Sequence, residues 1–264
     1  MGNVLSHSFS WECANQMAQM SRDAYLEPKE FKKKWKRAKF IEGDGTQCYI
    51  WRPPKDKQAG VWHKIVVVFR GTEPNEFEDI KSDLQFKKTA SEGAGSVHYG
   101  FKDALDDVWD KVSKELKPDD DIYFTGHSLG AALATLAAGR VNTEKVHLYT
   151  FGSPKCVNGI WGQDKVFREK TYRFRNNNDL ITKVPFFGYK HFGKMYYFNS
   201  NNEFVDKFNK WYLLGQWFKG TAKGLKQLKW DSFSDHSMNH YCSLIESKLD
   251  GNTDGIGEGK GETA

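Results

Sequence analysis

Short apolar runs alternate with amphipathic segments along most of the chain. Continuous apolar stretches at 65–69, 122–124 and 146–151 are typical of strands that are buried on both faces of a sheet. Between them, residues 101–116 carry apolar side chains at helical spacing, and the chain is rich in alanine and leucine from Ala131 onward. Strands that alternate with helices predict one α/β domain, with a mostly parallel central sheet and helices on both faces.

The flanking segments extend this pattern. Residues 10–25 have the spacing of an amphipathic helix. Further strands are predicted at 47–52, 171–174 and 194–199. From Gly251 onward the sequence is glycine-rich and polar, with no apolar residue beyond Ile256. We therefore expect a single domain over 1–250 and a disordered C-terminal tail over 251–264.

Composition narrows the classes of protein that fit. The chain has 264 residues, with 39 basic and 34 acidic side chains and a net charge of +5, and the basic residues do not gather on a nucleic-acid-binding motif. No apolar run is long enough to span a bilayer, and the N-terminus lacks a secretory signal. This favours a cytoplasmic protein, with peripheral membrane contact left open, or alternatively a mature form whose leader is missing. The four cysteines form no C-x-x-C pair, so we expect free thiols and no metal site.

One turn carries candidate chemistry: Gly126-His127-Ser128-Leu129-Gly130 lies between a predicted strand and a predicted helix. A G-x-S-x-G sequence in that setting lifts a serine hydroxyl above a sheet, and its glycines leave room for close contact between strand and helix. The helix that begins beyond Ser128 directs its free N–H groups toward negative charge that forms there. An ordinary glycine-rich turn could have the same five-residue sequence. The prediction of a nucleophile therefore depends on the position of this turn between a strand and a helix.

A nucleophilic serine needs a base, and the base needs an acid that orients it. In this architecture the acid follows the serine in the chain and stands just past the end of a strand. Asp179 has that position, after the polar run 175–178. The alternative is an Asx turn, which Asn-rich runs often form. Other aspartates, which lack the strand-end context, are Asp164, Asp206 and Asp231.

Three histidines could supply the base. His191 opens an outer strand, where we expect packing or a hydrogen bond. His236 lies in a loop before an apolar helical segment, which leaves its imidazole able to reach Ser128, whereas His240 would be held within the helix. The pair His236 and His240 has the spacing of a zinc helix, but Ser237 replaces the glutamate of H-E-x-x-H, so we expect no metal.

The oxyanion of an acyl-transfer reaction needs hydrogen-bond donors. The N–H of Leu129, which follows the nucleophile, is the first candidate. Thr72, in the loop after the strand at 65–69, offers an N–H and a hydroxyl as the second. The alternative is that Gly71-Thr72 only turns the chain. No cofactor is expected for such a site.

Together these motifs resemble the class 3 lipases, the family of the filamentous-fungal triacylglycerol lipases and their intracellular relatives. They follow the family's order between Trp62 and Leu244 and comprise Phe69-Arg70-Gly71-Thr72, Asp83-Leu84, Val97-His98-Tyr99-Gly100-Phe101, Gly126-His127-Ser128-Leu129-Gly130, Thr150-Phe151-Gly152-Ser153-Pro154, Asn178-Asp179 and Asp235-His236. The sequence departs from the family in three respects. The cysteines do not supply the disulfides of the extracellular members, the residues after Gly-Ser-Pro are one position out of register, and the region 199–234 is longer than in compact members.

The resemblance implies an α/β-hydrolase fold with a short lid helix over 73–84. It further implies Ser128 as nucleophile, Asp179 as acid and His236 as base, with an oxyanion hole formed by Thr72 and Leu129.

The activity that the resemblance implies is that of a serine hydrolase that cleaves carboxylic ester bonds of acylglycerol lipids through an acyl-enzyme. Phospholipase A1 activity is the main alternative, and a serine peptidase or a catalytically silent lipid-binding protein are further ones. Residues 204–228 interleave aromatic and lysine side chains. Such a segment suits contact with a lipid droplet or an anionic membrane surface, or alternatively a helix pair packed into the core.

Overall fold

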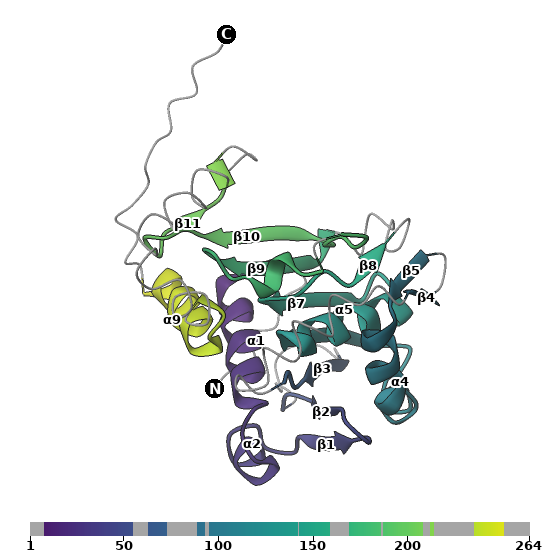
Figure 1. Cartoon of the computed structure of the whole chain (residues 1–264). Coiled ribbons are helices and arrows are strands. Elements are labelled where there is room, and N and C mark those ends of the chain that lie inside the picture. The colour runs from purple at the N-terminus through teal and green to yellow at the C-terminus, as the bar shows by residue number, and fades with distance from the viewer. Residues whose placement is uncertain are drawn as a thin grey trace.

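A computed structural model describes residues 8–54, 63–72, 89–92, 95–141, 143–158, 169–185, 187–207, 212–213 and 235–250. Its centre is an eight-stranded sheet (Figure 1). In spatial order the strands are β1 (Lys39–Glu42), β2 (Gln47–Trp51), β3 (His63–Phe69), β6 (Asp120–His127), β7 (Val146–Phe151), β9 (Thr171–Asn176), β10 (Lys194–Phe198) and β11 (Phe204–Val205).

The middle of this sheet is parallel. Strands β3, β6, β7, β9 and β10 pair in parallel, whereas β1, β2 and β11 add antiparallel pairs at the two edges. All residues of β6 are buried, as expected of a central strand that is covered on both faces, and the apolar run at 122–124 lies within it. The strands predicted at 47–52, 146–151, 171–174 and 194–199 are therefore confirmed to within two residues.

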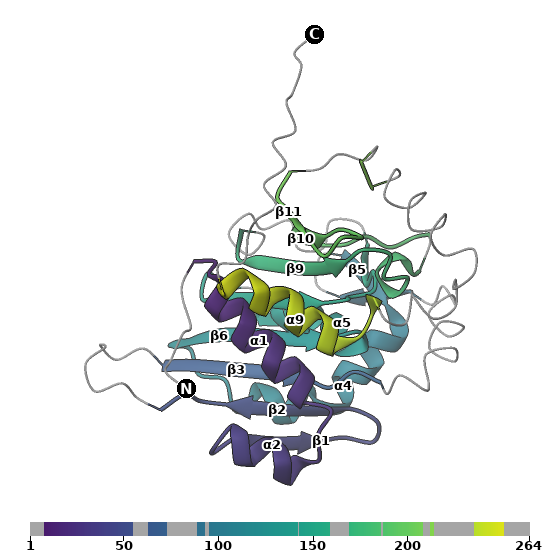
Figure 2. The ribbon, with the colours of Figure 1, turned by 90° about the vertical axis from the view of Figure 1, so that its left-hand side faces the viewer.

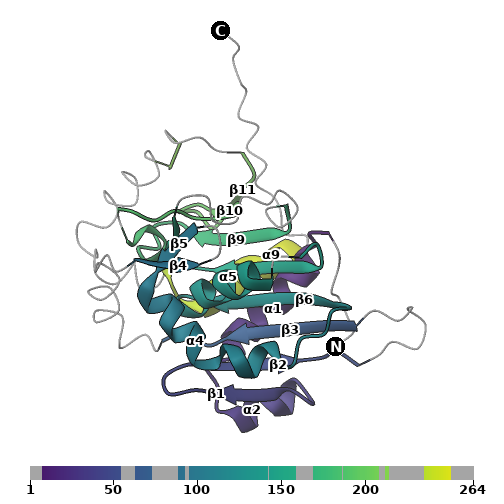
Figure 3. The ribbon, with the colours of Figure 1, turned by 90° about the vertical axis from the view of Figure 1, so that its right-hand side faces the viewer.

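Helices cover both faces of the sheet, as predicted. On one face lie α1 (Trp11–Asp23) and α9 (Met238–Leu249), side by side (Figure 2). On the other lie α4 (Tyr99–Ser113) and α5 (Leu129–Val141) (Figure 3). The small side chains of α5 are buried from Gly130 to Ala138, since a helix of alanines can lie close against the strands.

One feature differs from the sequence-based expectation. A second, antiparallel sheet forms from β4 (Thr89–Glu92), β5 (Gly95–His98) and β8 (Val157–Asn158), none of which the sequence pattern predicts. Elsewhere, α2 (Pro28–Lys34) carries exposed lysine side chains, and Phe31 and Trp35 are buried beneath them.

Several predictions fall on residues outside the described ranges. These are the lid helix over 73–84, most of the aromatic and basic segment 204–228, and the tail at 251–264. The described start of the aromatic segment is a strand: Phe204 in β11 packs against Trp11 and Tyr196. In the part of the chain that the structure describes, no helix is long and apolar enough to cross a bilayer. All four cysteines are buried and free, as predicted.

Candidate active site

Ser128 occupies the turn between β6 and α5. Its φ of +55° lies in the left-handed region that a residue with a side chain rarely adopts. Its backbone N–H donates to the carbonyl oxygen of Phe151 on β7, at 3.0 Å. The side chain is buried, and within the described residues its Oγ has no hydrogen-bond partner. A strained backbone that presents a free hydroxyl is the geometry expected of a nucleophile elbow.

The two glycines of the motif hold α5 against the ends of two strands. A Cβ on Gly126 would lie 2.4 Å from the carbonyl carbon of Gly130, and a Cβ on Gly130 would lie 2.3 Å from the carbonyl oxygen of Phe69. Only glycine fits at either position. The contact places Leu129, the first residue of α5, in a segment that touches the end of β3, from which Thr72 follows three residues later.

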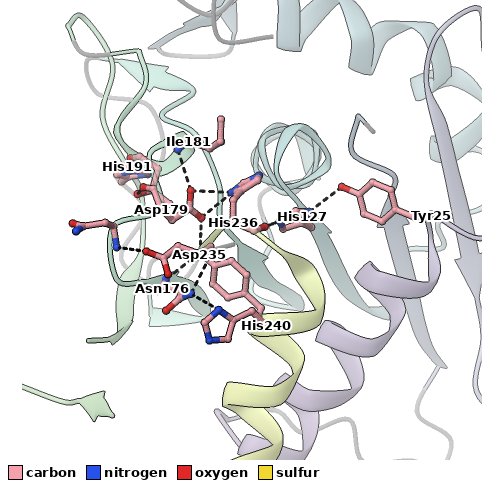
Figure 4. A network of polar contacts seen from close by, with 12 residues as sticks. Tyr25, His127, Asn176, Asp179, Ile181, His191, Asp235, His236 and His240 are labelled. Carbon is pink, nitrogen blue, oxygen red and sulfur yellow. Dashed lines mark hydrogen bonds and ion pairs between the residues drawn. The ribbon is translucent and has the colours of Figure 1, made fainter. Parts of the chain in front are cut away.

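Asp179 and His236 form a buried pair (Figure 4). The Nδ1–H of His236 donates to Asp179 Oδ2 at 2.8 Å and lies 2.9 Å from Oδ1. The same carboxylate accepts from the hydroxyl of Tyr241 at 2.6 Å and from the N–H of Ile181 at 3.0 Å. These donors orient the carboxylate, and because a carboxylate oxygen accepts from Nδ1, it fixes the Nδ1–H tautomer of His236.

Two residues near Ser128, Gly152 and His127, contact the Asp179–His236 pair. Gly152, which follows the Ser128 hydrogen-bond partner Phe151, has a φ of +58°. A Cβ on Gly152 would lie 2.8 Å from both Asp179 Oδ2 and His236 Cε1. His127, which precedes Ser128, has its ring 4.4 Å from that of His236. The structure thus places Ser128, Asp179 and His236, which are 51 and 57 positions apart in the chain, at the carboxyl ends of the parallel strands.

His127 also forms a hydrogen bond that stabilises the loop containing His236. Its Nε2 lies 2.7 Å from the carbonyl oxygen of His236, and because a carbonyl only accepts, Nε2 is the donor. Its Nδ1 must then accept from the hydroxyl of Tyr25, at 2.9 Å. Burial, together with the neighbouring His236, lowers the pKa of His127 well below its ordinary value, so the ring stays neutral in this one tautomer.

Replacing Tyr25 by phenylalanine should loosen this arrangement without removing any group that touches substrate. The buried Nδ1 of His127 would lose its donor, so we expect a loss of about 1–3 kcal/mol in the free energy of unfolding. Denaturant titration measures this. Tyr49→Phe is the matched control, because the Tyr49 hydroxyl makes a long contact of 3.3 Å to the carbonyl of Leu26 and none that involves His127. Equal stability losses in the two variants would contradict the role assigned to Tyr25.

Asp235 ties the turn before Asp179 to the His236 loop. Its Oδ2 accepts from the side-chain amide of Asn177 at 3.0 Å and from the N–H of Asn178 at 3.1 Å. The side-chain amide of Asn176 donates to the Asp235 backbone carbonyl at 3.0 Å (Figure 4). Burial raises the pKa of the Asp235 carboxyl to about 6, although its hydrogen-bond donors act in the opposite direction. The two segments that meet at the candidate site are therefore joined by a titratable group.

This pKa predicts a pH-dependent stability. Between the ordinary value of 3.8 and about 6, the folded Asp235 binds more protons than the unfolded one. The free energy of unfolding should therefore fall as pH rises through that window, by at most about 3 kcal/mol. Asp235→Asn, whose amide oxygen can still accept, should remove this fall when urea unfolding is measured from pH 4 to 7. The exposed Asp103→Asn should retain it. Parallel curves for wild type and Asp235→Asn would contradict the prediction.

The other sequence candidates lie elsewhere or are engaged differently. His191 donates from Nε2 to the carbonyl of Thr182 at 2.6 Å, as expected of a hydrogen-bonding histidine. His240 lies within α9, where its Nδ1 contacts the side-chain amide of Asn176 at 3.2 Å. Asp206 is exposed, and Asp164 and Asp231 fall outside the described residues. Across the described ranges, no group of three or more His, Cys, Asp and Glu side chains forms a metal site.

Sequence comparison supports the family resemblance. Residues 66–189, which include Ser128 and Asp179, match the family described as lipase (class 3). A triacylglycerol lipase of Ricinus communis is 27% identical over an alignment of 226 residues that covers 61% of this chain and 42% of the relative. A secreted mono- and diacylglycerol lipase of Penicillium cyclopium is 33% identical over 114 residues, which cover 39% of this chain and 37% of the relative. The matched region spans less than half the length of either relative.

Solved structures agree with the fold. The Rhizomucor miehei lipase–propeptide complex superposes with a TM-score of 0.58 at 23% identity, covering 76% of this chain and 75% of the other. Lipase II of Rhizopus niveus superposes with a TM-score of 0.55 at 24% identity, covering 71% of this chain and 80% of the other. These similarities, with the mostly parallel sheet, confirm the predicted α/β-hydrolase fold.

Proposed function

Residues 66–189 belong to the class 3 lipase family, and from that premise we propose that this chain is a serine hydrolase that cleaves carboxylic ester bonds of acylglycerol lipids. The observation that supports the proposal most strongly is the buried Asp179–His236 pair, which packs against Gly152 beside the Ser128 turn. The triacylglycerol and mono- and diacylglycerol lipases among the relatives support the substrate class.

In the proposed reaction, His236 removes the proton of Ser128 Oγ as this oxygen attacks the ester carbonyl carbon. Asp179 keeps the His236 Nδ1–H in place and stabilises the imidazolium that forms. The ring then returns the proton to the departing alcohol, and an acyl-enzyme remains. Water, activated by the same imidazole, hydrolyses it to a free fatty acid.

The oxyanion that forms in both steps needs donors within about 3 Å. Leu129 and Thr72 are the proposed donors: Leu129 contributes the N–H at the start of α5, and Thr72 contributes its N–H and hydroxyl from the segment that follows β3. A helix N-terminus has unsatisfied N–H groups and a positive dipole end, which suits this role. One such donor typically contributes about 3–4 kcal/mol of transition-state stabilisation.

We further propose that the protein binds its substrate at a lipid surface and that residues 73–84 cover the site. The supporting pattern is the apolar face formed by Phe77, Ile80 and Leu84 in the sequence. The interleaved aromatic and lysine side chains of 204–228 suit an anionic surface or a lipid droplet. Co-sedimentation with anionic vesicles, with and without lysine-to-glutamate changes in this segment, tests the membrane part.

A fluorophosphonate probe tests the hydrolase proposal directly, because it forms a covalent bond only with an activated serine. We expect stoichiometric labelling, with the adduct at Ser128 by peptide mass spectrometry. A panel of purified tri-, di- and monoacylglycerols and phospholipids, scored for released fatty acid, then defines the substrate class. A protein that neither reacts with the probe nor releases fatty acid would be a lipid-binding relative rather than an enzyme.

A further inference from the structure

Five basic side chains lie close enough to interact with one another, near the turn that carries Asp179. They are Lys155, Arg173, Arg175, Lys183 and His191. Arg173 and Arg175 lie two positions apart on β9, so both project from the same face of the sheet. The ammonium group of Lys155 donates to the carbonyl of Pro185 at 3.3 Å, which holds this lysine beside the segment that follows Lys183.

The cluster contains no acidic partner in the described chain. None of the five side chains forms an ion pair there, and Nε of both arginines and Nζ of Lys183 are buried without a hydrogen-bond acceptor. The guanidinium of Arg175 lies over the ring of Tyr197, 5.6 Å from its centroid. Arg173 is 9% exposed, so little water reaches it.

The two carboxylates nearest to Lys183 are already engaged. Asp179 and Asp235 both attract the Lys183 ammonium group. However, Asp179 accepts from His236 and Tyr241, and Asp235 accepts from the 177–178 turn. The oxygens of these carboxylates are therefore occupied by other donors, and their two negative charges offset only part of the positive charge carried by Lys155, Arg173, Arg175 and Lys183.

Such a cluster is unfavourable as it stands, because buried like charges repel. Burial, and then repulsion from Arg175, lowers the pKa of Lys183 to about 8 and that of Arg173 to about 10. Burial and repulsion from Arg173 lower the pKa of His191 well below its ordinary value. An anion bound among these groups would remove the repulsion and supply acceptors for the buried N–H groups.

We propose that Arg173, Arg175 and Lys183 form a binding site for a phosphoryl group, distinct from the candidate active site. A phosphoryl group fits because it brings one or two negative charges and several acceptor oxygens to a site with several unpaired donors. The group is either a free phosphate ion or the phosphate of a lipid headgroup, since both present the same oxygens.

The test uses the Ser128→Ala protein throughout, so that lipid is not hydrolysed and the result does not depend on the proposed activity. Inorganic phosphate is titrated by calorimetry and by thermal melting, in chloride buffer. We expect saturable binding that weakens about 10- to 100-fold in Arg175→Gln and in Lys183→Gln. Lys36→Gln, which removes an exposed positive charge elsewhere, should bind phosphate like the parent.

The thermal data separate a binding role from a packing role. In chloride buffer alone, Arg175→Gln should melt at a higher temperature than the parent, since it relieves repulsion. A residue that only packs or pairs within the fold would instead lower the melting temperature in every buffer. Absence of saturable phosphate binding, unchanged affinity in both variants, or a lower melting temperature of Arg175→Gln with and without phosphate would overturn the proposal.

Dihexanoyl phosphatidic acid, used below its micelle concentration, distinguishes the two sources. Displacement of phosphate by this lipid, but not by dihexanoylglycerol, assigns the site to a lipid headgroup. Phosphate binding that the lipid does not displace assigns it to the free ion. Either result supports a phosphoryl site.

Discussion

Replacing Ser128 by alanine should lower kcat for ester hydrolysis by about 10⁴- to 10⁶-fold. The change removes the proposed nucleophile, so no acyl-enzyme can form, and only the slow attack of water in the oxyanion site remains. Stability should change by less than about 1 kcal/mol, because the buried Oγ forms no hydrogen bond in the described structure and the backbone keeps its conformation.

Release of fatty acid from a short-chain ester measures the loss, and urea unfolding measures the stability. Ser113→Ala is the matched control, since the Ser113 hydroxyl donates to the carbonyl of Asp110 at the end of α4, away from the site. The control should keep full activity. If Ser128→Ala still turned over ester at the wild-type rate, the assignment of the nucleophile would be wrong, whatever the fold.

Asp179→Asn should lower kcat by about 10⁴-fold and leave KM nearly unchanged. The amide loses the negative charge that stabilises the imidazolium, and its NH₂ group can donate to Nδ1 of His236, which favours the opposite tautomer. The buried site would also retain donors from Tyr241 and Ile181 with fewer acceptors to receive them. We therefore expect a loss of about 1.5–3 kcal/mol in the free energy of unfolding as well.

Steady-state kinetics at a temperature below the unfolding transition measures the loss of kcat separately from the loss of stability. Asp206→Asn is the control, because Asp206 is an exposed aspartate that follows β11 and was itself a candidate acid in the sequence. We expect it to be neutral in both kinetics and stability. A large loss in Asp206→Asn with none in Asp179→Asn would reverse the assignment. An increase of KM in Asp179→Asn without a change in kcat would instead assign Asp179 to substrate binding.

The fold was predictable where residues close in sequence determine it. The apolar runs at 65–69 and 146–151 require burial on both faces, and the structure places them within the parallel part of the sheet. The strand–turn–helix around Ser128 follows from the glycines and the alanine-rich helix. Asp179 is predicted as the acid from its place just past a strand, and the structure shows that β9 ends three residues before it.

Other parts of the site depend on contacts between distant residues, and no local pattern encodes those. Helical periodicity shows that Tyr241 faces inward, but not that its hydroxyl meets Asp179, 62 positions away. The bonds of His127 to Tyr25 and to His236 span 102 and 109 positions. The small antiparallel sheet was missed for a related reason: β8 is two residues long and pairs with a strand some 60 positions earlier.

The place of α9 in the chain has a consequence for biosynthesis. His236 enters the site at the start of this last described helix, which contacts α1 through Gln19 with Glu246 and through Lys248 with Trp11. A ribosome therefore releases the proposed nucleophile Ser128 and the proposed acid Asp179 well before the proposed base His236. A nascent or prematurely terminated chain that ends before residue 235 would hold an inert serine. Hydrolytic competence would thus be gained only when the C-terminal helix docks beside the N-terminal one.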